Sequence, residues 1–326
     1  MGRLERAWYE DGWPARLLAP MGTLYCALAG LRRRAYLAGR RPSWRAPVPV
    51  VVVGNLTVGG TGKTPLVVWL SERLVHAGFR PGIVSRGYGG SAAAPRWVGP
   101  DSDPGQVGDE AVLLAARTAR PVVVGRDRPA AVRYLLEHAG CDIVLSDDGL
   151  QHYPLQRDVE IAVVDGRRRL GNGRCLPAGP LREPASRLAA ADFVVANGPA
   201  AAGEVAMRLV GDELCAVGEG GRRRPLHAFA GQRVHAVAGI GHPGRFFDDL
   251  RARGFTVVEH AFPDHHRFGP ADLEFGDDAP VVMTEKDAVK CRPFARDGQW
   301  YLPVQAVLPE DFSERLLARL KGNANG

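Results

Sequence analysis

The stretch Val48-Pro-Val-Val-Val-Val-Gly54-Asn-Leu-Thr57-Val-Gly-Gly-Thr-Gly-Lys63-Thr64 decides the fold of this chain. A run of valines predicts a buried strand, and the glycine-rich segment after it predicts a turn. Apolar residues at helical spacing then predict a helix that stops at Gly78. These residues are Leu66, Val67, Leu70, Leu74 and Val75. A strand, a glycine-rich loop and a helix therefore follow one another without interruption.

This arrangement is typical of a phosphate cradle. Small residues let backbone N–H groups converge on an anion, and the N-terminus of the helix adds positive potential. Lys63 is placed to reach the β- and γ-phosphates, and the Thr64 hydroxyl is placed to bind Mg²⁺. The usual pattern has glycine where this chain has Thr57. The predicted nucleotide-binding residues are Thr57, Val58, Gly59, Gly60, Thr61, Gly62, Lys63 and Thr64. The loop predicts a protein that binds a nucleoside triphosphate.

Strand and helix patterns alternate along the remaining chain, which predicts an α/β fold with a doubly wound, mostly parallel sheet. In such sheets ligands bind at the carboxyl ends of the strands. A second, smaller α/β unit is expected after the first, because strand and helix patterns resume at Val234. The expected divisions are an N-terminal helical segment (1–46), a core with the phosphate loop (47–198), a linker (199–231) and a C-terminal α/β domain (232–326).

Composition limits the class of protein. A chain of 326 residues with 45% hydrophobic residues can build a sizeable core, and its length suggests two domains. Five cysteines without paired spacing argue against a disulfide framework or a zinc site and fit a reducing compartment. The opening residues lack the basic and apolar pattern of a cleavable signal peptide, because Glu5, Glu10 and Asp11 lie among them.

The formal net charge of +6 is confined to residues 1–46, which hold nine arginines and three acidic residues. A nucleic-acid-binding protein normally spreads positive charge over its folded surface, so no nucleic-acid partner is expected. The apolar stretch from Trp13 to Leu31 has helical spacing but contains proline, glycine and Arg16, which makes it a poor bilayer span. An amphipathic helix on an anionic membrane surface is one interpretation, and a helix packed on the catalytic domain is the other.

Four further residues carry groups able to do chemistry: Asp147, Asp148, Asp109 and His265. Asp147 and Asp148 follow an apolar strand, where phosphate-loop enzymes place the carboxylate that orders Mg²⁺. Asp109 lies at a predicted helix start, either as an N-cap or as a carboxylate able to accept a proton from an attacking hydroxyl. His265 belongs to an Asp-His-His run. Adjacent histidines on a strand point to opposite faces, which favours a single histidine as base or donor over a two-histidine metal site.

One motif favours a different function. Gly239-Ile-Gly241-His-Pro-Gly244 follows a predicted strand and fits the dinucleotide-binding fingerprint, with Glu259 at the expected distance. Pro243 weakens this alternative, because it removes a backbone N–H where a pyrophosphate needs one. The remaining chain is also too short for a full cofactor domain of six strands.

Eight motifs together resemble one known family. They are Asn55-Leu-Thr-Val-Gly-Gly-Thr-Gly-Lys-Thr-Pro65, Ser85-Arg-Gly-Tyr-Gly-Gly90, Gly108-Asp-Glu110, Asp147-Asp-Gly-Leu-Gln-His152, Gly171-Asn-Gly173, Leu176-Pro-Ala-Gly-Pro-Leu-Arg-Glu183, Gly239-Ile-Gly-His-Pro243 and Met283-Thr-Glu-Lys-Asp287. In this order the motifs closely resemble the tetraacyldisaccharide 4′-kinases, the lipid A 4′-kinases. The resemblance spans nearly the whole chain and accounts for Thr57, because the family has threonine there.

The resemblance implies ATP-dependent phosphorylation of the 4′-hydroxyl of a lipid A disaccharide 1-phosphate, which forms lipid IVA. It implies ATP and Mg²⁺ as cofactors and an active site between two α/β domains, and it implies no particular protein partner. It also implies a peripheral enzyme at the cytoplasmic face of the bacterial inner membrane, with an N-terminal helix that meets the anionic membrane surface. By motif, Asp109 is the expected base with His265 in support. Lys63 and Thr64 then hold phosphates and Mg²⁺, and Asp147 or Asp148 completes the shell of the ion.

A second class of protein remains open from the residues. A nucleotide-driven switch, such as a membrane-recruited ATPase or GTPase, uses a related loop. The chain contains no Asn-Lys-x-Asp motif to read guanine, which disfavours the GTPase form.

Overall fold

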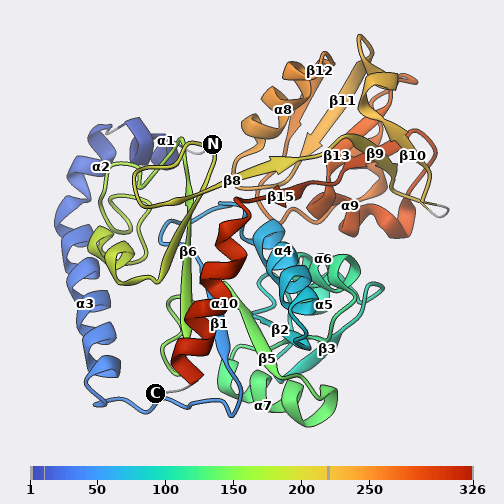
Figure 1. The fold of residues 1–326 in the computed structure, drawn as a ribbon. Helices are drawn as coiled ribbons and strands as arrows, with labels where there is room; N and C mark the ends of the chain where they lie inside the picture. The colour runs from blue at the N-terminus through green and yellow to red at the C-terminus, as the bar shows by residue number, and fades with distance from the viewer. Residues whose placement is uncertain (1–2, 11, 219–220, 325–326) are drawn as a thin grey trace.

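The protein is described here by a computed structural model that covers residues 3–10, 12–218 and 221–324. Asp11, part of the expected N-terminal segment, lies outside these described residues. Two sheets organise the chain, one of nine strands and one of six (Figure 1). The predicted fold class is confirmed, because the strands of the larger sheet pair mostly in parallel with helices on both faces.

The larger sheet contains the phosphate-loop strand at its centre. Only its two edge strands pair antiparallel. In spatial order the strands are β15 (Gln305–Val307), β8 (Val205–Val210), β7 (Phe193–Asn197), β6 (Val159–Asp165), β1 (Val50–Gly54), β5 (Ile143–Asp147), β2 (Pro81–Ser85), β4 (Val122–Val124) and β3 (Arg96–Val98).

Two hydrophobic cores cover the two faces of this sheet, and alternate residues of β1 point into each. Val51 and Val53 join the core under α4 (Lys63–His76), α6 (Asp109–Thr118) and α10 (Asp311–Ala324). Val50 and Val52 join the opposite core, which α7 (Arg128–Ala139) covers. Because β1 is buried on both faces, its sequence is an uninterrupted valine run rather than an alternating pattern.

The smaller sheet has four parallel strands and two antiparallel strands at one end. In order they are β10 (Arg223–Pro225), β9 (Glu213–Ala216), β14 (Gln299–Leu302), β13 (Val281–Thr284), β11 (Arg233–Ala238) and β12 (Thr256–Ala261). Its α-helices are α8 (Pro243–Ala252) and α9 (Glu285–Cys291). Short helical segments complete the chain: α5 (Pro104–Val107), η1 (Ala185–Ala190), η2 (Leu226–Phe229), η3 (Pro270–Leu273) and η4 (Arg292–Phe294).

The chain enters the smaller sheet and then returns to the larger one. The expected linker, 199–231, includes β8 of the larger sheet and β9 and β10 of the smaller sheet. Within the expected C-terminal domain, 232–326, β15 pairs with β8, and α10 packs in the core beneath β1. By sheet membership the smaller unit therefore runs from β9 to β14. The chain passes between the two sheets twice, after β8 and before β15.

Three helices form the N-terminal segment: α1 (Arg3–Glu10), α2 (Trp13–Leu17) and α3 (Ala19–Leu37), drawn in blue along one side of Figure 1. The predicted apolar stripe faces outward instead of packing on the core. Its exposed members are Trp13, Leu17, Met21, Leu24, Tyr25, Leu28 and Leu31, with Leu37 beyond them. Among the helices of the described chain, none combines the length and apolarity that crossing a bilayer needs.

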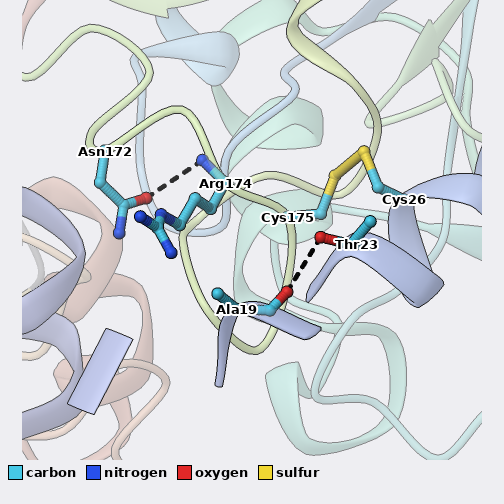
Figure 2. The surroundings of a disulfide bond; sticks show 6 residues. All are labelled: Ala19, Thr23, Cys26, Asn172, Arg174 and Cys175. Atoms are coloured by element: carbon cyan, nitrogen blue, oxygen red, sulfur yellow. Dashed lines mark hydrogen bonds between the residues drawn. A yellow bond between two sulfur atoms is a disulfide. The ribbon is translucent and has the colours of Figure 1, made fainter. Parts of the chain in front are cut away.

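A disulfide connects α3 to the larger-sheet unit, although the spacing of the cysteines gave no sign of it (Figure 2). Cys26 and Cys175 are bonded with their Cα atoms 5.5 Å apart, although 149 residues separate them in sequence. Close packing brings them together, since a Cβ on Gly22 would lie 2.8 Å from the carbonyl oxygen of Cys175. Spacing along the chain cannot reveal a contact made by tertiary packing. The other three cysteines are buried free thiols.

Candidate functional site

Asn55 makes hydrogen bonds to several residues of the loop between β1 and α4. Its side-chain amide donates hydrogen bonds to the carbonyl oxygens of Thr57 (2.7 Å) and Gly59 (3.2 Å), and its side-chain oxygen accepts one from Lys63 Nζ (2.9 Å). Gly62 adopts a φ of 94°, which glycine tolerates and other residues rarely do. The predicted phosphate-loop residues therefore form one continuous loop with the lysine folded back across it.

Asp148 lies at the carboxyl end of β5, beside the loop lysine. One of its oxygens is 3.3 Å from Lys63 Nζ, and both oxygens are 3.1 Å from Arg182 Nη1. Burial raises the pKa of this carboxyl, but the two cations outweigh burial and hold the pKa well below its usual range. Asp148 is therefore a stable anion that positions Lys63. Arg182 was not among the predicted site residues.

Asp147, the neighbouring residue, is fully buried. Burial, together with the nearby charges of Glu110 and Asp148, raises the pKa of Asp147 to about 7. Ser85 Oγ lies 3.4 Å from one carboxylate oxygen, and the other oxygen has no hydrogen-bond partner within the described residues. A buried carboxylate with an unpartnered oxygen is an unfavourable arrangement unless a proton or a cation completes it.

These donors fit a magnesium ion. Mg²⁺ keeps several waters and uses one or two carboxylates together with substrate phosphates, so it needs no dedicated cage of protein ligands. Residues 3–10, 12–218 and 221–324 contain no cluster of three His, Cys, Asp or Glu side chains suited to a metal. Asp147 offers its unpartnered oxygen, and Thr64 lies in the first turn of α4. Asp148 is less available, because Arg182 and Lys63 already contact it.

Asp109 and His265 are brought together from the two units. His265 Nδ1 lies 3.1 Å from both carboxylate oxygens of Asp109, which is 4% exposed. Two lysines are nearby, with Lys286 Nζ at 3.9 Å and Lys290 Nζ at 3.8 Å from Asp109 Oδ2. Burial raises the pKa of Asp109, but the hydrogen bond to His265 and the charges of the two lysines lower it further than burial raises it. The carboxylate is thus ionised at neutral pH.

Lys286 is a member of this cluster that the sequence reasoning did not single out. Its Nζ contacts Glu110 Oε1 (3.1 Å), Asp264 Oδ1 (3.3 Å) and His265 Nε2 (3.4 Å). Burial lowers the pKa of this amine, but the carboxylates around it raise the pKa to well above its usual range. Lys286 follows the carboxyl end of β13, and a basic residue at such a strand end was the available signal.

The glycine motif at 239–244 lies against the phosphate loop and not around a second nucleotide. A Cβ added to Gly241 would lie 3.1 Å from the backbone nitrogen of Gly60. The backbone N–H of Gly239, the first glycine of the motif, donates a hydrogen bond to Asp287 Oδ2 (2.8 Å). This N–H is therefore already used within the protein. The dinucleotide interpretation is therefore wrong, and the motif allows the two units to approach closely.

The parallel sheet and the glycine-rich loop between β1 and α4, with Lys63 folded back across it, are features of a phosphate-loop nucleotide-binding protein. The family model for Tetraacyldisaccharide-1-P 4′-kinase matches residues 14–321. The chain belongs to this family.

Similar proteins agree with this placement. Tetraacyldisaccharide 4′-kinase of Nitrosococcus oceani is 53% identical over 317 residues, covering 97% of this chain and 94% of the relative. The enzyme of the same name from Xanthomonas euvesicatoria pv. vesicatoria is 55% identical over 330 residues, covering 96% and 94%. The crystal structure of LpxK from Aquifex aeolicus in complex with ATP superposes with a TM-score of 0.78 at 27% identity, covering 94% of this chain and 99% of that one.

Proposed function

We propose that this protein transfers the γ-phosphoryl group of ATP to the 4′-hydroxyl of a tetraacylated disaccharide 1-phosphate, forming lipid IVA. The observation that carries the proposal is the contact between Asp109 and His265. The contact orients an ionised carboxylate, and this supports the proposal because an acceptor hydroxyl needs a group that takes its proton.

In this proposal Asp109 is the general base. The 4′-oxygen attacks the γ-phosphorus, the bond from that phosphorus to the bridging oxygen of ADP breaks, and the hydroxyl proton passes to the carboxylate. His265 Nδ1 donates to both oxygens of Asp109 and fixes its orientation. Lys286 lies on the other side of the imidazole ring, 3.4 Å from Nε2, and helps to hold the histidine in place.

The phosphate loop performs the electrostatic part of the reaction. Phosphoryl transfer needs charge neutralisation and in-line geometry more than covalent chemistry from the protein. Lys63 supplies a positive charge to the β- and γ-phosphates, and Asp148 with Asn55 positions it. Thr64 and Asp147 would hold Mg²⁺, which would supply further neutralisation of the charge on the phosphates. Asp148 serves mainly to orient Lys63.

The N-terminal helices are proposed to bring the enzyme to its substrate at the membrane surface. Trp13, Leu17 and Leu24 are 75%, 72% and 62% exposed. Large apolar side chains exposed together in this way are unusual on the surface of a soluble protein and are typical of an interaction site. Arginines lie further along α3, at 32–34, and suit anionic headgroups. These features support a peripheral enzyme at the cytoplasmic face of the inner membrane. Its substrate would be a lipid that lies in the bilayer and already carries a 1-phosphate.

The experiment is an incubation with γ-³²P-labelled ATP and the disaccharide 1-phosphate in mixed micelles, followed by separation of lipid from inorganic phosphate. Label in the lipid at one equivalent per ADP formed supports the proposal. Label released to water, with or without lipid, would instead identify a nucleotide-driven switch.

A further inference from the structure

A buried asparagine links the phosphate loop to the second unit. Asn197 is the last residue of β7 and is 2% exposed. Its side-chain amide donates a hydrogen bond to the carbonyl oxygen of Thr61 (3.1 Å). Its side-chain oxygen accepts one from Arg245 Nη2 (2.8 Å), on α8 of the smaller-sheet unit. Because one end of the amide meets an acceptor and the other a donor, its orientation is set by both partners.

The hydrogen bond to Thr61 determines the direction of a peptide group inside the phosphate loop. In a planar trans peptide, the N–H of Gly62 points opposite to the carbonyl of Thr61. Asn197 therefore turns this N–H away from itself and leaves it available to a phosphate. Only glycine fits at position 62, since a Cβ there would lie 2.6 Å from Asn197 Nδ2.

Arg245 contacts the ends of two adjacent strands, β7 and β6, which lie on one side of β1. Besides Asn197 at the end of β7, its guanidinium lies 3.6 Å from Asp165 Oδ2 at the end of β6. Asp165 is itself held by backbone N–H groups of Arg167 (2.9 Å) and Arg168 (3.0 Å), which makes it a fixed anchor. The neighbouring Gly241 brings the same segment against Gly60. The second unit thus contacts the loop directly by backbone packing at Gly241, and indirectly through the hydrogen bond from Arg245 to Asn197.

We propose that Arg245 is a positioning residue for ATP, acting through Asn197 to hold the phosphate loop in its binding conformation. The proposal rests on ATP being the phosphoryl donor, as in the proposed function. Because Arg245 comes from the second unit, the position of that unit then affects the affinity for the triphosphate. This effect on affinity acts on the phosphate groups of ATP, so it does not depend on the adenine base or on the lipid substrate.

The test compares Arg245→Ala with Arg251→Ala, which removes another arginine of α8 whose partners Asp248 and Glu259 lie in the smaller-sheet unit. Calorimetry measures the affinity for ATP. Competition against ATP measures the affinity for inorganic tripolyphosphate, which lacks the nucleoside. Arg245→Ala is expected to weaken both ligands by about tenfold, the effect of losing one hydrogen bond to a charged group. Arg251→Ala should leave both unchanged, and neither variant should change KM for the lipid.

A double-mutant cycle decides whether Arg245 acts through Asn197. In the Asn197→Asp background, which keeps an acceptor for Arg245 but loses the donor to Thr61, ATP binding should already be weak. Adding Arg245→Ala should then cost less than about twofold more. If Arg245→Ala lowers ATP affinity as much in the Asn197→Asp background as in wild type, Arg245 does not act through Asn197 and the proposal is overturned. Loss of ATP affinity with normal tripolyphosphate affinity would also overturn it, by showing a direct contact with the nucleoside. If the asparagine variant does not fold, the comparison of ATP with tripolyphosphate in Arg245→Ala still decides.

Failure of this inference is separate from failure of the proposed function. Arg245→Ala with wild-type ATP and tripolyphosphate affinities contradicts the positioning role, even when the wild-type protein phosphorylates lipid normally. Conversely, a wild-type protein that binds ATP but leaves the lipid unlabelled contradicts the proposed function only. Arg245→Lys, which retains one donor and the charge, should recover part of the lost affinity.

Discussion

His265 Nδ1 lies 3.1 Å from both oxygens of the Asp109 carboxylate, across 156 residues of sequence and between the two sheets. The pair joins a helix start of the larger unit to a loop of the smaller one. The proposed general base and the histidine proposed to orient it therefore come together only when the two units are in contact.

Removing the carboxylate should abolish most of the chemistry. We expect Asp109→Ala to lower kcat by roughly 10²–10⁴, the usual contribution of a general base, while ATP binding survives. His265→Ala should cost the same or less, and the double variant should be barely worse than Asp109→Ala alone, because residues that act as a unit are not additive. Steady-state kinetics of all three variants check this. Losses that multiply fully would show that the two residues act independently.

Lys63→Ala and Thr64→Ala should both cripple turnover. Lys63 neutralises charge at the phosphates, and we expect its loss to cost on the order of 10²-fold or more in kcat. Lys321→Ala, which removes an exposed lysine on α10, is the matched control and should behave as wild type. The measurement is the initial rate at saturating ATP. Wild-type activity in Lys63→Ala would contradict the phosphate-cradle assignment.

Charging the exposed stripe should detach the protein from membranes. Leu24 and Leu28 are 62% and 57% exposed, so Leu24→Glu and Leu28→Glu should leave folding intact. Each should reduce sedimentation with vesicles that contain anionic lipid, and added salt should weaken wild-type binding in the same direction. Val307→Glu alters an exposed apolar residue at the edge of the larger sheet and should have no effect on sedimentation. A wild-type protein that ignores such vesicles at low salt would refute membrane docking.

The contact between the two units should also make stability depend on pH. Burial lowers the pKa of His265, but the hydrogen bond to Asp109 and the nearby carboxylates raise it above its ordinary value of 6.5. A raised folded-state pKa gives stability that is fully present below the unfolded pKa and is lost as the pH rises through the folded pKa. The Tm difference between wild type and His265→Gln should therefore be larger near about pH 6 than near about pH 9.

Thermal unfolding of both proteins at the two pH values measures this effect, with His227→Gln as a control at an exposed histidine. A Tm difference that grows with pH would contradict the ion pair. Asp109, whose pKa is lowered, acts in the opposite sense: its contribution is present above its ordinary pKa and is lost as the pH falls through the folded value.

Local patterns were sufficient to predict the fold class and the phosphate loop, because strand, turn and helix follow one another around Lys63. The same patterns could place Asp147, Asp148 and Asp109 at strand or helix ends, but their roles stay predictions. Arg182, Lys286 and the disulfide partner of Cys26 were missed, since each owes its position to packing between distant segments. The return of β15 and α10 to the larger sheet was missed for the same reason.

The position of the transferred phosphate tests the account most directly. The wild-type protein is incubated with Mg²⁺, γ-³²P-labelled ATP and the disaccharide 1-phosphate, and the labelled position in the lipid product is determined by mild acid hydrolysis and mass spectrometry. The account predicts label at the 4′-oxygen of the distal sugar, one equivalent per ADP, with the signal reduced roughly 10²–10⁴-fold in Asp109→Ala. Label at another hydroxyl, label in inorganic phosphate, or full activity of Asp109→Ala would contradict it.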